Sequence, residues 1–324
     1  MTIVIIGLGS MGKRRVRLIR QLNPDIEIIG VDNSLDKREE ASEVFNIKVY
    51  SSLEKAIRNE SLDVAFVATS PLTHSSIITM CLQNNMHVFT ELNLVSDGYS
   101  DIIKLANDKN LKLFISSTLL YRKDLAYIAN RVTGNKVNYM YHVGQYLPDW
   151  HPWEDYKNYF VGNKKTNGCR EIFAIDLPWI IRTFGEIEDI NVMKDKNSQL
   201  DIDYNDNYIV SFKHKNGNKG TICVDVISRK AVRALEVFSE KVHIFWRGTP
   251  NSLYEYDFNI NEEVAIKTYE YVDKDERYSE NIIENAYLDE IITFFKFIND
   301  KEQPIYTIYD DLKTLDLIDR IEEE

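Results

Sequence analysis

Short, β-branched apolar runs alternate with amphipathic stretches through the first third of the chain. The runs are continuous rather than alternating, as expected for strands buried on both faces of a parallel sheet. They fall at 3–7, 27–32, 63–69, 87–91 and 112–116, with a shorter extended piece at 47–50. Helical patterns lie between them at 11–22, 35–44, 52–59, 74–84 and 98–109. This alternation predicts a doubly wound parallel sheet of the Rossmann type over residues 1–118.

The pattern changes near residue 119. Longer segments at 137–146, 208–217, 220–228 and 234–246 predict antiparallel strands, and HKNGNKG has the composition of a hairpin turn between two of them. Helices are expected at 121–133, 170–184, 281–298 and 308–322. The chain is therefore predicted to be of the α/β class, with a C-terminal α+β domain (119–324) built on an open, mostly antiparallel sheet. We assign substrate binding and oligomerisation to this domain, and its last helix (308–322) is a candidate for packing back on the first.

Composition narrows the range of partners. A chain of 324 residues suits two domains, and a net charge of -12 argues against nucleic acid, which requires an excess of Lys and Arg. The cysteines Cys81, Cys169 and Cys223 show no metal-like spacing, so we expect no metal and a reducing, cytoplasmic compartment. No apolar run is long enough to span a membrane. A homo-oligomer, dimer or tetramer, is the expected assembly.

The segment GLGSMG (7–12) has the G-x-G-x-x-G spacing of a dinucleotide-binding loop, with Ser10 and Met11 between the glycines. It follows a predicted strand and opens a predicted helix, which is the context that gives the motif meaning. Gly7 permits the tight turn, Gly9 lets backbone amides approach a pyrophosphate, and Gly12 lets helix and strand pack closely. The alternative is that three glycines only tighten a turn.

Asp32 ends the second predicted strand, 20 residues after Gly12. A carboxylate there accepts hydrogen bonds from the ribose hydroxyls and repels a 2′-phosphate, which favours NAD over NADP. Lys37 and Arg38 follow closely and keep NADP as an alternative, although both also fit a solvated helix face.

The segment VATSPLTH (67–74) ends another strand on the side where open α/β sheets bind ligands. Its polar residues would lie beside the ribose and nicotinamide, and Pro71 ends the strand. The predicted cofactor contacts here are Thr69, Ser70, Pro71 and His74. For His74, a place in a helix without any ligand is an equal alternative.

Taken together, five segments resemble the Gfo/Idh/MocA oxidoreductases, the family of glucose–fructose oxidoreductase and inositol dehydrogenase. They are GLGSMG, DVAFVATSPLTH, HVFTELNLV, VGQYLPDW and PIYTIYDDLKTLDLIDRI. The resemblance implies a Rossmann domain, a C-terminal domain whose open sheet often makes oligomer contacts, and NAD(P)-dependent chemistry on a sugar, an inositol or a nucleotide-linked sugar.

Two departures from the family pattern concern catalysis. Where the family carries Glu-Lys-Pro, this chain has Glu91, Leu92 and Asn93; Glu91 can still meet the cofactor, but Leu92 can neither donate nor accept a proton. Where the family has an Asp and, four residues on, a His, the matching positions are Glu171 and Ile175. The usual acid/base residues are therefore missing.

Hydride transfer to or from a carbinol carbon still needs a partner for the hydroxyl proton. The candidates named for catalysis are Glu171, Asp176 and His151, with Tyr146 and Tyr121 also considered. Glu171 has the best positional argument. A helix-start carboxylate with no catalytic role is the alternative for both acids.

The loop GQYLPDWHPWEDY (144–156) combines aromatic rings with carboxylates, a combination that suits a sugar or a base. Tyr146, Trp150 and Trp153 are predicted to contact substrate, and a surface loop pinned by its aromatics is the alternative. Tyr121 and Arg122, at the start of the second domain, are further candidates, with Arg122 as a binder of phosphate or carboxylate. An ordinary surface arginine is the alternative there.

Two functions of different class fit these observations. The first is an NAD(P)-dependent oxidoreductase acting on a sugar-like substrate with a non-standard acid/base group. The second is a catalytically inactive, dinucleotide-binding sensor or scaffold.

Overall fold

The computed structural model describes residues 1–151, 154–275 and 280–324. The chain forms two compact units. The first contains Met1–Ser117 and Tyr287–Leu312, and the second contains Thr118–Ala286 and Lys313–Glu324.

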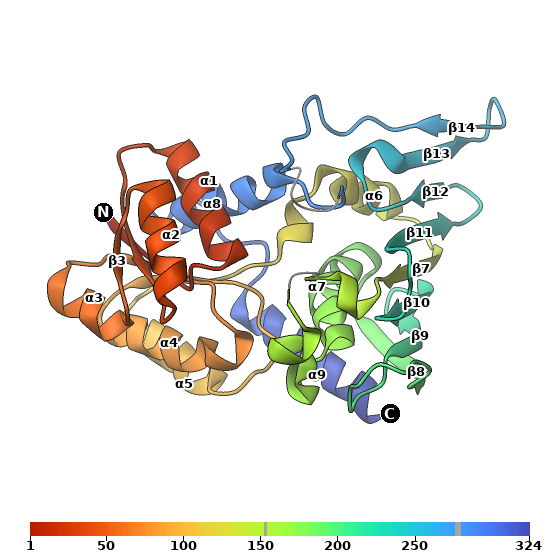
Figure 1. The fold of residues 1–324 in the computed structure, drawn as a ribbon. Coiled ribbons are helices and arrows are strands. Elements are labelled where there is room, and N and C mark those ends of the chain that lie inside the picture. The colour runs from red at the N-terminus through yellow and green to blue at the C-terminus, as the bar shows by residue number, and fades with distance from the viewer. Residues whose placement is uncertain (152–153, 276–279) are drawn as a thin grey trace. The chain divides into compact units, whose positions relative to one another are not determined.

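The first unit is built on a parallel sheet of six strands in the order β3-β2-β1-β4-β5-β6 (Figure 1). The order reverses between β1 and β4, which is the switch point of a doubly wound sheet. The Rossmann prediction is therefore confirmed. The strands are β1 (Thr2–Ile6), β2 (Glu27–Val31), β3 (Lys48–Tyr50), β4 (Val64–Val67), β5 (His87–Thr90) and β6 (Leu113–Ile115). The helices between them are α1 (Ser10–Leu22), α2 (Leu35–Phe45), α3 (Leu53–Asn59), α4 (Pro71–Gln83) and α5 (Tyr99–Asp108).

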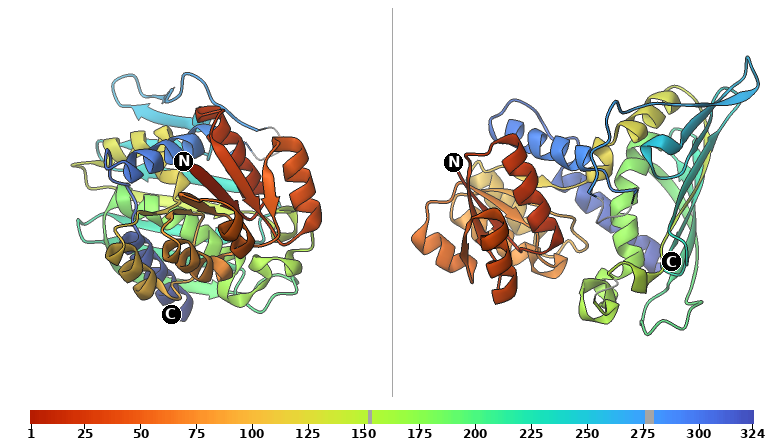
Figure 2. Two further views of the ribbon diagram at one scale, coloured as in Figure 1. Left: turned by 90° about the vertical axis from the view of Figure 1, so that its left-hand side faces the viewer. Right: turned by 45° about the horizontal axis from the view of Figure 1, so that its top comes forward.

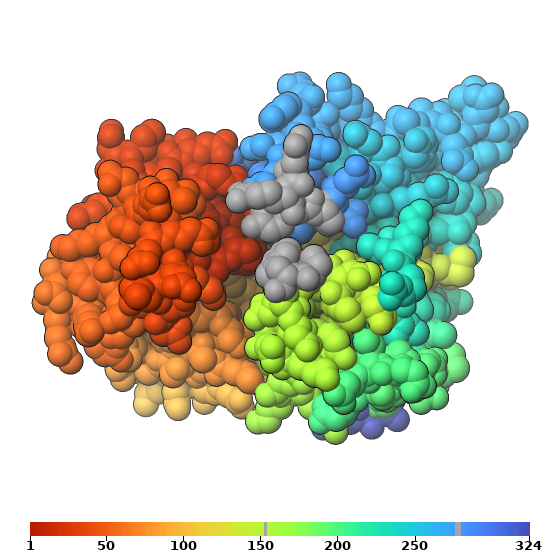
Figure 3. Space-filling model, in the orientation of Figure 1, coloured from red at the N-terminus to blue at the C-terminus, as the bar shows by residue number. Residues whose placement is uncertain are grey.

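Exposure and capping residues explain the surface position of α2 and the residues at which α2, α3 and α4 begin. The outer side of α2, whose only buried residue is Ala41, forms part of the surface (Figure 3). Ser34 and Ser52 accept hydrogen bonds from backbone amides at the starts of α2 and α3, as N-caps do. α4 begins earlier than the predicted residue 74. Pro71 occupies its first turn, where a residue without an N–H costs nothing.

Aromatic residues form much of the core of this unit. Phe66, Phe89 and Phe114 stand side by side on β4, β5 and β6, with ring centroids 4.8 and 5.1 Å apart. Phe294 of α8 (Glu284–Ile298) meets all three rings in edge contacts at 5.4–5.6 Å. Tilted and edge-on ring packing of this kind adds to the stabilisation from area burial, and it ties α8 to the central strands.

The second unit is built on an eight-stranded sheet in the order β14-β13-β12-β11-β7-β10-β9-β8. Its strands are β7 (Asn138–Gly144), β8 (Ile187–Asp195), β9 (Asn207–His214), β10 (Lys219–Asp225), β11 (Val232–Phe238), β12 (His243–Trp246), β13 (Leu253–Asp257) and β14 (Glu262–Ala265). All neighbours are antiparallel except β7 and β10, which are parallel. The prediction of a mostly antiparallel sheet is confirmed.

Two helices, α6 (Lys123–Val132) and α7 (Gly168–Phe184), lie on one face of this sheet (Figure 2). Burial alternates along β9, with Tyr208, Val210 and Phe212 buried and the residues between them exposed, so one face packs and the other is open. The chain ends in α9 (Ile308–Glu323).

The predicted strand pattern of the second unit was incomplete. The run 234–246 is two strands, β11 and β12, joined by a turn in which Ser239 N donates to Val242 O. Strands β8, β13 and β14 were not predicted, because their sequences are too charged to show an apolar period of two. In the part of the chain that the structure describes, no helix is long and apolar enough to cross a membrane.

Candidate active site

The loop after β1 is shaped by close backbone contacts. Gly7 has a φ of +94°, and a Cβ there would lie 2.4 Å from the carbonyl oxygen of Ala68. A Cβ at Gly12 would lie 1.8 Å from the carbonyl oxygen of Gly7. Both positions therefore require glycine for the fold itself.

Gly9 differs from its neighbours. A Cβ there would meet no heavy atom within 4 Å among the described residues, and its φ of -73° is open to any amino acid. Gly9 also caps α1, whose first intrahelical bond runs from Lys13 N to Gly9 O. The amides of the first turn, which includes Ser10 and Met11, thus have no acceptor within the helix, and no acidic residue occupies that turn. The residues fit the pyrophosphate of a dinucleotide, because open space meets a helix N-terminus here.

Asp32 follows β2 and is held by the backbone. Its Oδ2 accepts from Leu8 N at 2.8 Å and its Oδ1 accepts from Ser34 N at 2.9 Å. Arg38 turns back and donates from Nη1 to the carbonyl oxygen of Asp32 at 2.7 Å. The carboxylate is therefore fixed beside the glycine loop, at the position where a ribose is read in this fold.

We expect the charge of Asp32 to set cofactor choice. Asp32→Asn keeps an acceptor oxygen and removes the charge that repels a 2′-phosphate, so the NADPH-to-NADH affinity ratio should rise by about tenfold or more. Calorimetric titration of both dinucleotides measures this ratio. Asp36→Asn, an exposed change in the first turn of α2, is the matched control and should leave the ratio unchanged. An equal ratio in wild type and Asp32→Asn would contradict this role.

The segment after β4 is braced by His74, which is buried within α4. Its Nε2 lies 3.0 Å from the carbonyl oxygen of Thr69, and its Nδ1 lies 2.8 Å from Oδ1 of Asn93. Burial lowers the pKa of His74 below its usual value. The ring thus fixes the end of β4. Thr69, Ser70 and Pro71 follow the carboxyl end of this strand, with Ser70 as the N-cap of α4 and Pro71 in its first turn. The sequence pattern did not single out Asn93 as a partner of His74.

Glu91 is tied to a buried arginine. Arg15 Nε donates to Glu91 Oε1 at 2.5 Å and Nη2 donates to Glu290 Oε2 at 2.9 Å, and the Arg15 side chain is fully buried. The guanidinium also lies 4.4 Å above the ring centroid of Phe89. The two carboxylates compensate the buried charge, so Glu91 holds the end of β5 to α1 and α8. The buried role of Arg15 was not predicted, because an arginine in an amphipathic helix is expected on the solvent-exposed face.

The second unit contains a carboxyl group, that of Glu171, which differs from Glu91 in having a buried oxygen without a partner in the described chain. Glu171 lies in the first turn of α7, which Asn167 caps by accepting from Arg170 N. Its Oε2 is buried and has no hydrogen-bond partner in the described parts of the chain. Burial raises the pKa of Glu171 to about 8, and this outweighs the tendency of a helix N-terminus to favour the charged form.

Two aromatic residues belong to the same neighbourhood, His151 from the loop predicted to bind substrate and Tyr159 just beyond that loop. Burial, then the charges of Glu171 and Glu154, raise the pKa of Tyr159. The Tyr159 hydroxyl is buried without a partner among the described residues, and its ring stacks on His151 at 4.5 Å. Burial lowers the pKa of His151, so the imidazole is neutral near pH 7. Tyr159 was missed from the sequence because nothing in its spacing separates it from other loop tyrosines.

Asp176, the other carboxylate proposed for catalysis, is placed in a structural role. It is fully buried, and its Oδ1 accepts from Tyr141 Oη, Trp179 Nε1 and Arg233 Nη1 at 2.7–2.9 Å. A carboxylate oxygen that accepts from three donors, one of them a guanidinium, is engaged in structural contacts. Each acid has one buried oxygen without a hydrogen-bond partner in the described chain, Oε2 of Glu171 and Oδ2 of Asp176. Asp176 differs in that its other oxygen is paired with Arg233, so it holds the sheet to α7.

Two further residues predicted to bind substrate, Arg122 and Tyr121, make structural contacts within the second unit. Arg122 is buried, and its guanidinium donates to Asp124, Asn281 O and Gly248 O, so it is a structural arginine rather than a free anion binder. Tyr121 packs against the cluster of Tyr269, Ile283 and Ala286.

Two aromatic residues of the loop stay partly accessible. The ring of Tyr146 is covered by the Arg229 guanidinium at 4.0 Å, and Trp150 Nε1 donates to Gln145 O at 3.0 Å. Trp153 lies outside the described residues.

With this geometry established, comparisons with known proteins identify the first unit. Residues 1–116 match the model of an oxidoreductase family with an NAD-binding Rossmann fold, GFO_IDH_MocA. Residues 1–116 are therefore similar to the NAD-binding domain of these oxidoreductases. Mouse biliverdin reductase A is 25% identical over 139 residues, which are 42% of this chain and 45% of that protein. The chain therefore matches less than half the length of this curated relative.

Solved structures of other oxidoreductases share the whole fold. Myo-inositol dehydrogenase from Corynebacterium glutamicum has a TM-score of 0.77 at 17% identity, covering 100% of this chain and 96% of that one. Biliverdin reductase from Synechocystis, crystallised with biliverdin and NADP+, has a TM-score of 0.76 at 15% identity, covering 99% and 98%. Identities this low show the common fold and leave the substrate open.

Proposed function

We propose that the protein is an NAD(P)-dependent oxidoreductase that reduces a carbonyl group of a sugar-like substrate, with Glu171 as the proton donor. The reduced nicotinamide supplies the hydride when it is bound. The family of the first unit and the open helix N-terminus at Gly9 support the cofactor. The observation that carries the proposal is the buried Oε2 of Glu171, which has no hydrogen-bond partner among the described residues, together with the raised pKa of this carboxyl.

The raised pKa of Glu171 favours the reducing direction. With a pKa of about 8, the carboxyl is protonated roughly ten to one at pH 7, so a proton is available for a developing alkoxide. Alcohol oxidation would need the ionised form as a base, which is the minor species at that pH. Leu92 has no polar atom and takes no part. Glu171 would thus supply the proton that Leu92 cannot.

Nearby polar groups support a substrate rich in oxygen. Tyr159 brings a buried hydroxyl with no partner in the described chain, and His151 brings a neutral imidazole. Both groups can form hydrogen bonds with hydroxyl or carbonyl oxygens. Trp150 offers an aromatic face, which suits the C–H surface of a sugar ring.

A second candidate is the reduction of a linear tetrapyrrole. One observation favours it, the sequence likeness to biliverdin reductase A over 139 residues. An acid that protonates a substrate as hydride arrives serves this reaction as well. The two candidates differ in substrate shape and polarity, so one assay separates them.

The test measures NADH and NADPH oxidation with a panel of an oxidised inositol, keto-hexoses, keto forms of UDP-linked sugars, and biliverdin. We expect turnover with one of the keto-sugar classes, and transfer of deuterium from C4-deuterated cofactor into the product. Turnover with biliverdin alone would replace the sugar proposal by the tetrapyrrole one. Tight dinucleotide binding with no turnover on any member would instead favour the inactive sensor.

A further inference from the structure

The open face of the second unit's sheet carries three potential metal ligands. The parallel pairing of β7 with β10 places His142 directly opposite Cys223, and Asp225 follows two residues later on the same strand. Side chains two residues apart share a face of a strand. Tyr141, Val143, Ile222 and Val224 alternate with these three and are buried on the opposite face.

Donor atoms of these side chains converge. His142 Nε2 lies 2.7 Å from Asp225 Oδ2, and one ligand atom from each of His142, Cys223 and Asp225 lies within 4.8 Å of the other two. Imidazole, thiolate and carboxylate are all ligands of Zn²⁺, with bonds of about 2.0–2.3 Å. A tetrahedral cation with bonds of this length needs the imidazole nitrogen and the carboxylate oxygen about 3.3 Å apart, so these two atoms would separate by about 0.6 Å from their present 2.7 Å.

The carboxylate of Asp225 is held in place by a second layer of contacts. Its Oδ1 accepts from Ile227 N at 2.9 Å and Ser228 N at 2.7 Å, and its Oδ2 accepts from Ser228 Oγ at 2.9 Å. Gly144 leaves space for this carboxylate, since a Cβ at that position would lie 2.4 Å from Asp225 Oδ2. Outer contacts of this kind orient the ligands of established metal sites.

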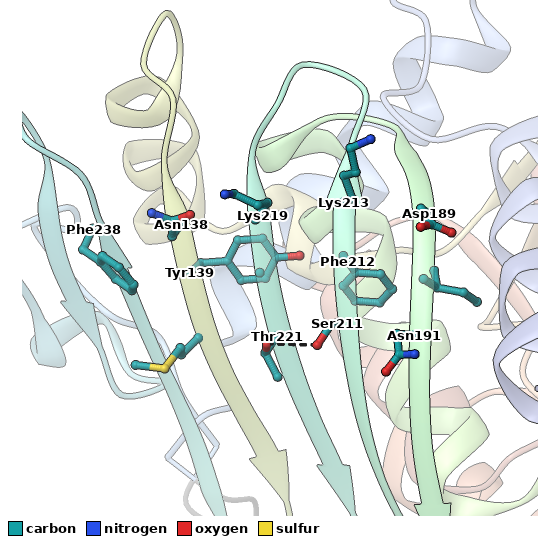
Figure 4. A pocket seen from close by; sticks show the side chains of 13 residues that line it. Asn138, Tyr139, Asp189, Asn191, Ser211, Phe212, Lys213, Lys219, Thr221 and Phe238 are labelled. Atoms are coloured by element: carbon teal, nitrogen blue, oxygen red, sulfur yellow. Dashed lines mark hydrogen bonds between the residues drawn. The ribbon is translucent and has the colours of Figure 1, made fainter.

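The cluster is reachable from solvent. The side chain of His142 is 41% exposed, and His142 and Cys223 line a hollow of 500 Å³ on the sheet. A neighbouring hollow of 470 Å³ lies along the same strands, where Ser211 and Thr221 meet across β9 and β10 (Figure 4). A hydrated cation can therefore enter, and a fourth coordination position stays open.

We propose that His142, Cys223 and Asp225 form a binding site for a divalent zinc-like cation, coordinated by Nε2, Sγ and Oδ2 with water as the fourth ligand. The imidazole binds in its neutral form with the proton on Nδ1, and the thiol proton is released to solvent. A soft thiolate beside imidazole favours zinc over magnesium or calcium, which prefer oxygen ligands alone. The proposal is independent of the function proposed for Glu171.

Cobalt(II) is the probe for this site, because a thiolate–cobalt bond gives charge-transfer absorption in the near ultraviolet. Titration of the metal-free full chain should produce this band at one equivalent, and added Zn²⁺ should remove it. His142→Gln should weaken cobalt binding by roughly 10-fold or more. Cys223→Ser should abolish the band, whereas Cys81→Ala, a change at a buried cysteine outside the cluster, should keep it.

Thiol alkylation gives a second readout in the unaltered protein. Cys81 and Cys169 are buried and Cys223 is partly exposed, so iodoacetamide should label Cys223 first. Zn²⁺ should slow this labelling at least about 10-fold in wild type and leave it unchanged in His142→Gln. Absence of a charge-transfer band in wild type, or a band that survives Cys223→Ser, would overturn the proposal. Labelling that Zn²⁺ does not slow would overturn it too.

Discussion

Glu171→Gln should lower kcat for carbonyl reduction by about 10²–10³-fold, while the dissociation constant for NADH changes little. Glutamine keeps the size of the side chain and removes the transferable proton, and general acid catalysis contributes about 10²–10⁴-fold. The effect should fall on kcat rather than KM, because proton donation matters in the transition state. Steady-state kinetics at pH 7 with the best substrate of the panel measure this.

The pH profile provides an independent check. Since the pKa of Glu171 is raised to about 8, the reduction rate should be level at neutral pH and fall about tenfold per pH unit above 8. This alkaline limb should be absent in Glu171→Gln.

Glu188→Gln, an exposed change on β8 of the same unit, is the matched control and should retain full activity. Tyr159→Phe should have an intermediate effect. A Glu171→Gln enzyme that keeps more than a fifth of wild-type kcat would exclude Glu171 as the acid.

The same group affects stability in a definite direction. Its folded pKa of about 8 lies above the ordinary 4.5, so the folded state binds the proton more tightly than the unfolded state. Below pH 4.5 both states are protonated. Between 4.5 and 8 the unfolded chain ionises while the folded carboxyl stays neutral, so stability from this group is lost as the pH rises. The melting temperature of Glu171→Gln relative to wild type should therefore be higher at pH 8.5 than at pH 5.

The alternating first unit was predictable because a buried parallel strand needs a continuous apolar run. Five strands of this sheet, β1, β2, β4, β5 and β6, have such a run. The second unit was harder. β13 and β14 are half-exposed or exposed, so no apolar period marks them, and the break between β11 and β12 depends on the turn at Ser239–Val242. Strand order was not readable either, since the parallel neighbours β7 and β10 are far apart in sequence.

The site residues show the same contrast between features set by local sequence and features set by distant contacts. The glycine loop and Asp32 could be predicted because local backbone geometry fixes what they do. Glu171 and Asp176 could not be told apart from the sequence, because both are acids on one helix. Both have a buried oxygen without a partner in the described chain, and the bond from Arg233, far away in the sequence, is what gives Asp176 its structural role. The same limit applies to His142 and Cys223, whose proximity depends on strand pairing.

A pair of alanine substitutions separates folding from cofactor binding in the glycine loop. In Gly12→Ala the new methyl would lie 1.8 Å from the backbone oxygen of Gly7, which cannot move freely, since Gly7 N donates to Val31 O at 2.8 Å. Overpacking of this kind costs about 1–3 kcal/mol. We therefore expect a lower melting temperature for Gly12→Ala even without dinucleotide.

Gly9→Ala should behave in the opposite way. Its methyl meets nothing within 4 Å in the described structure, and its backbone angles suit alanine, so the melting temperature of the free protein should match wild type. If the pyrophosphate approaches the amides at this helix end, the methyl would obstruct it. Losing one or two charge-assisted hydrogen bonds, at about 1.5–3 kcal/mol each, would then weaken NADH binding by about tenfold to several hundredfold. Thermal melts and calorimetric titrations of both variants measure the two effects. Normal NADH affinity in Gly9→Ala would mean that the phosphates do not lie against this turn, because the open space at Gly9 is the feature that distinguishes a binding loop from a tight turn.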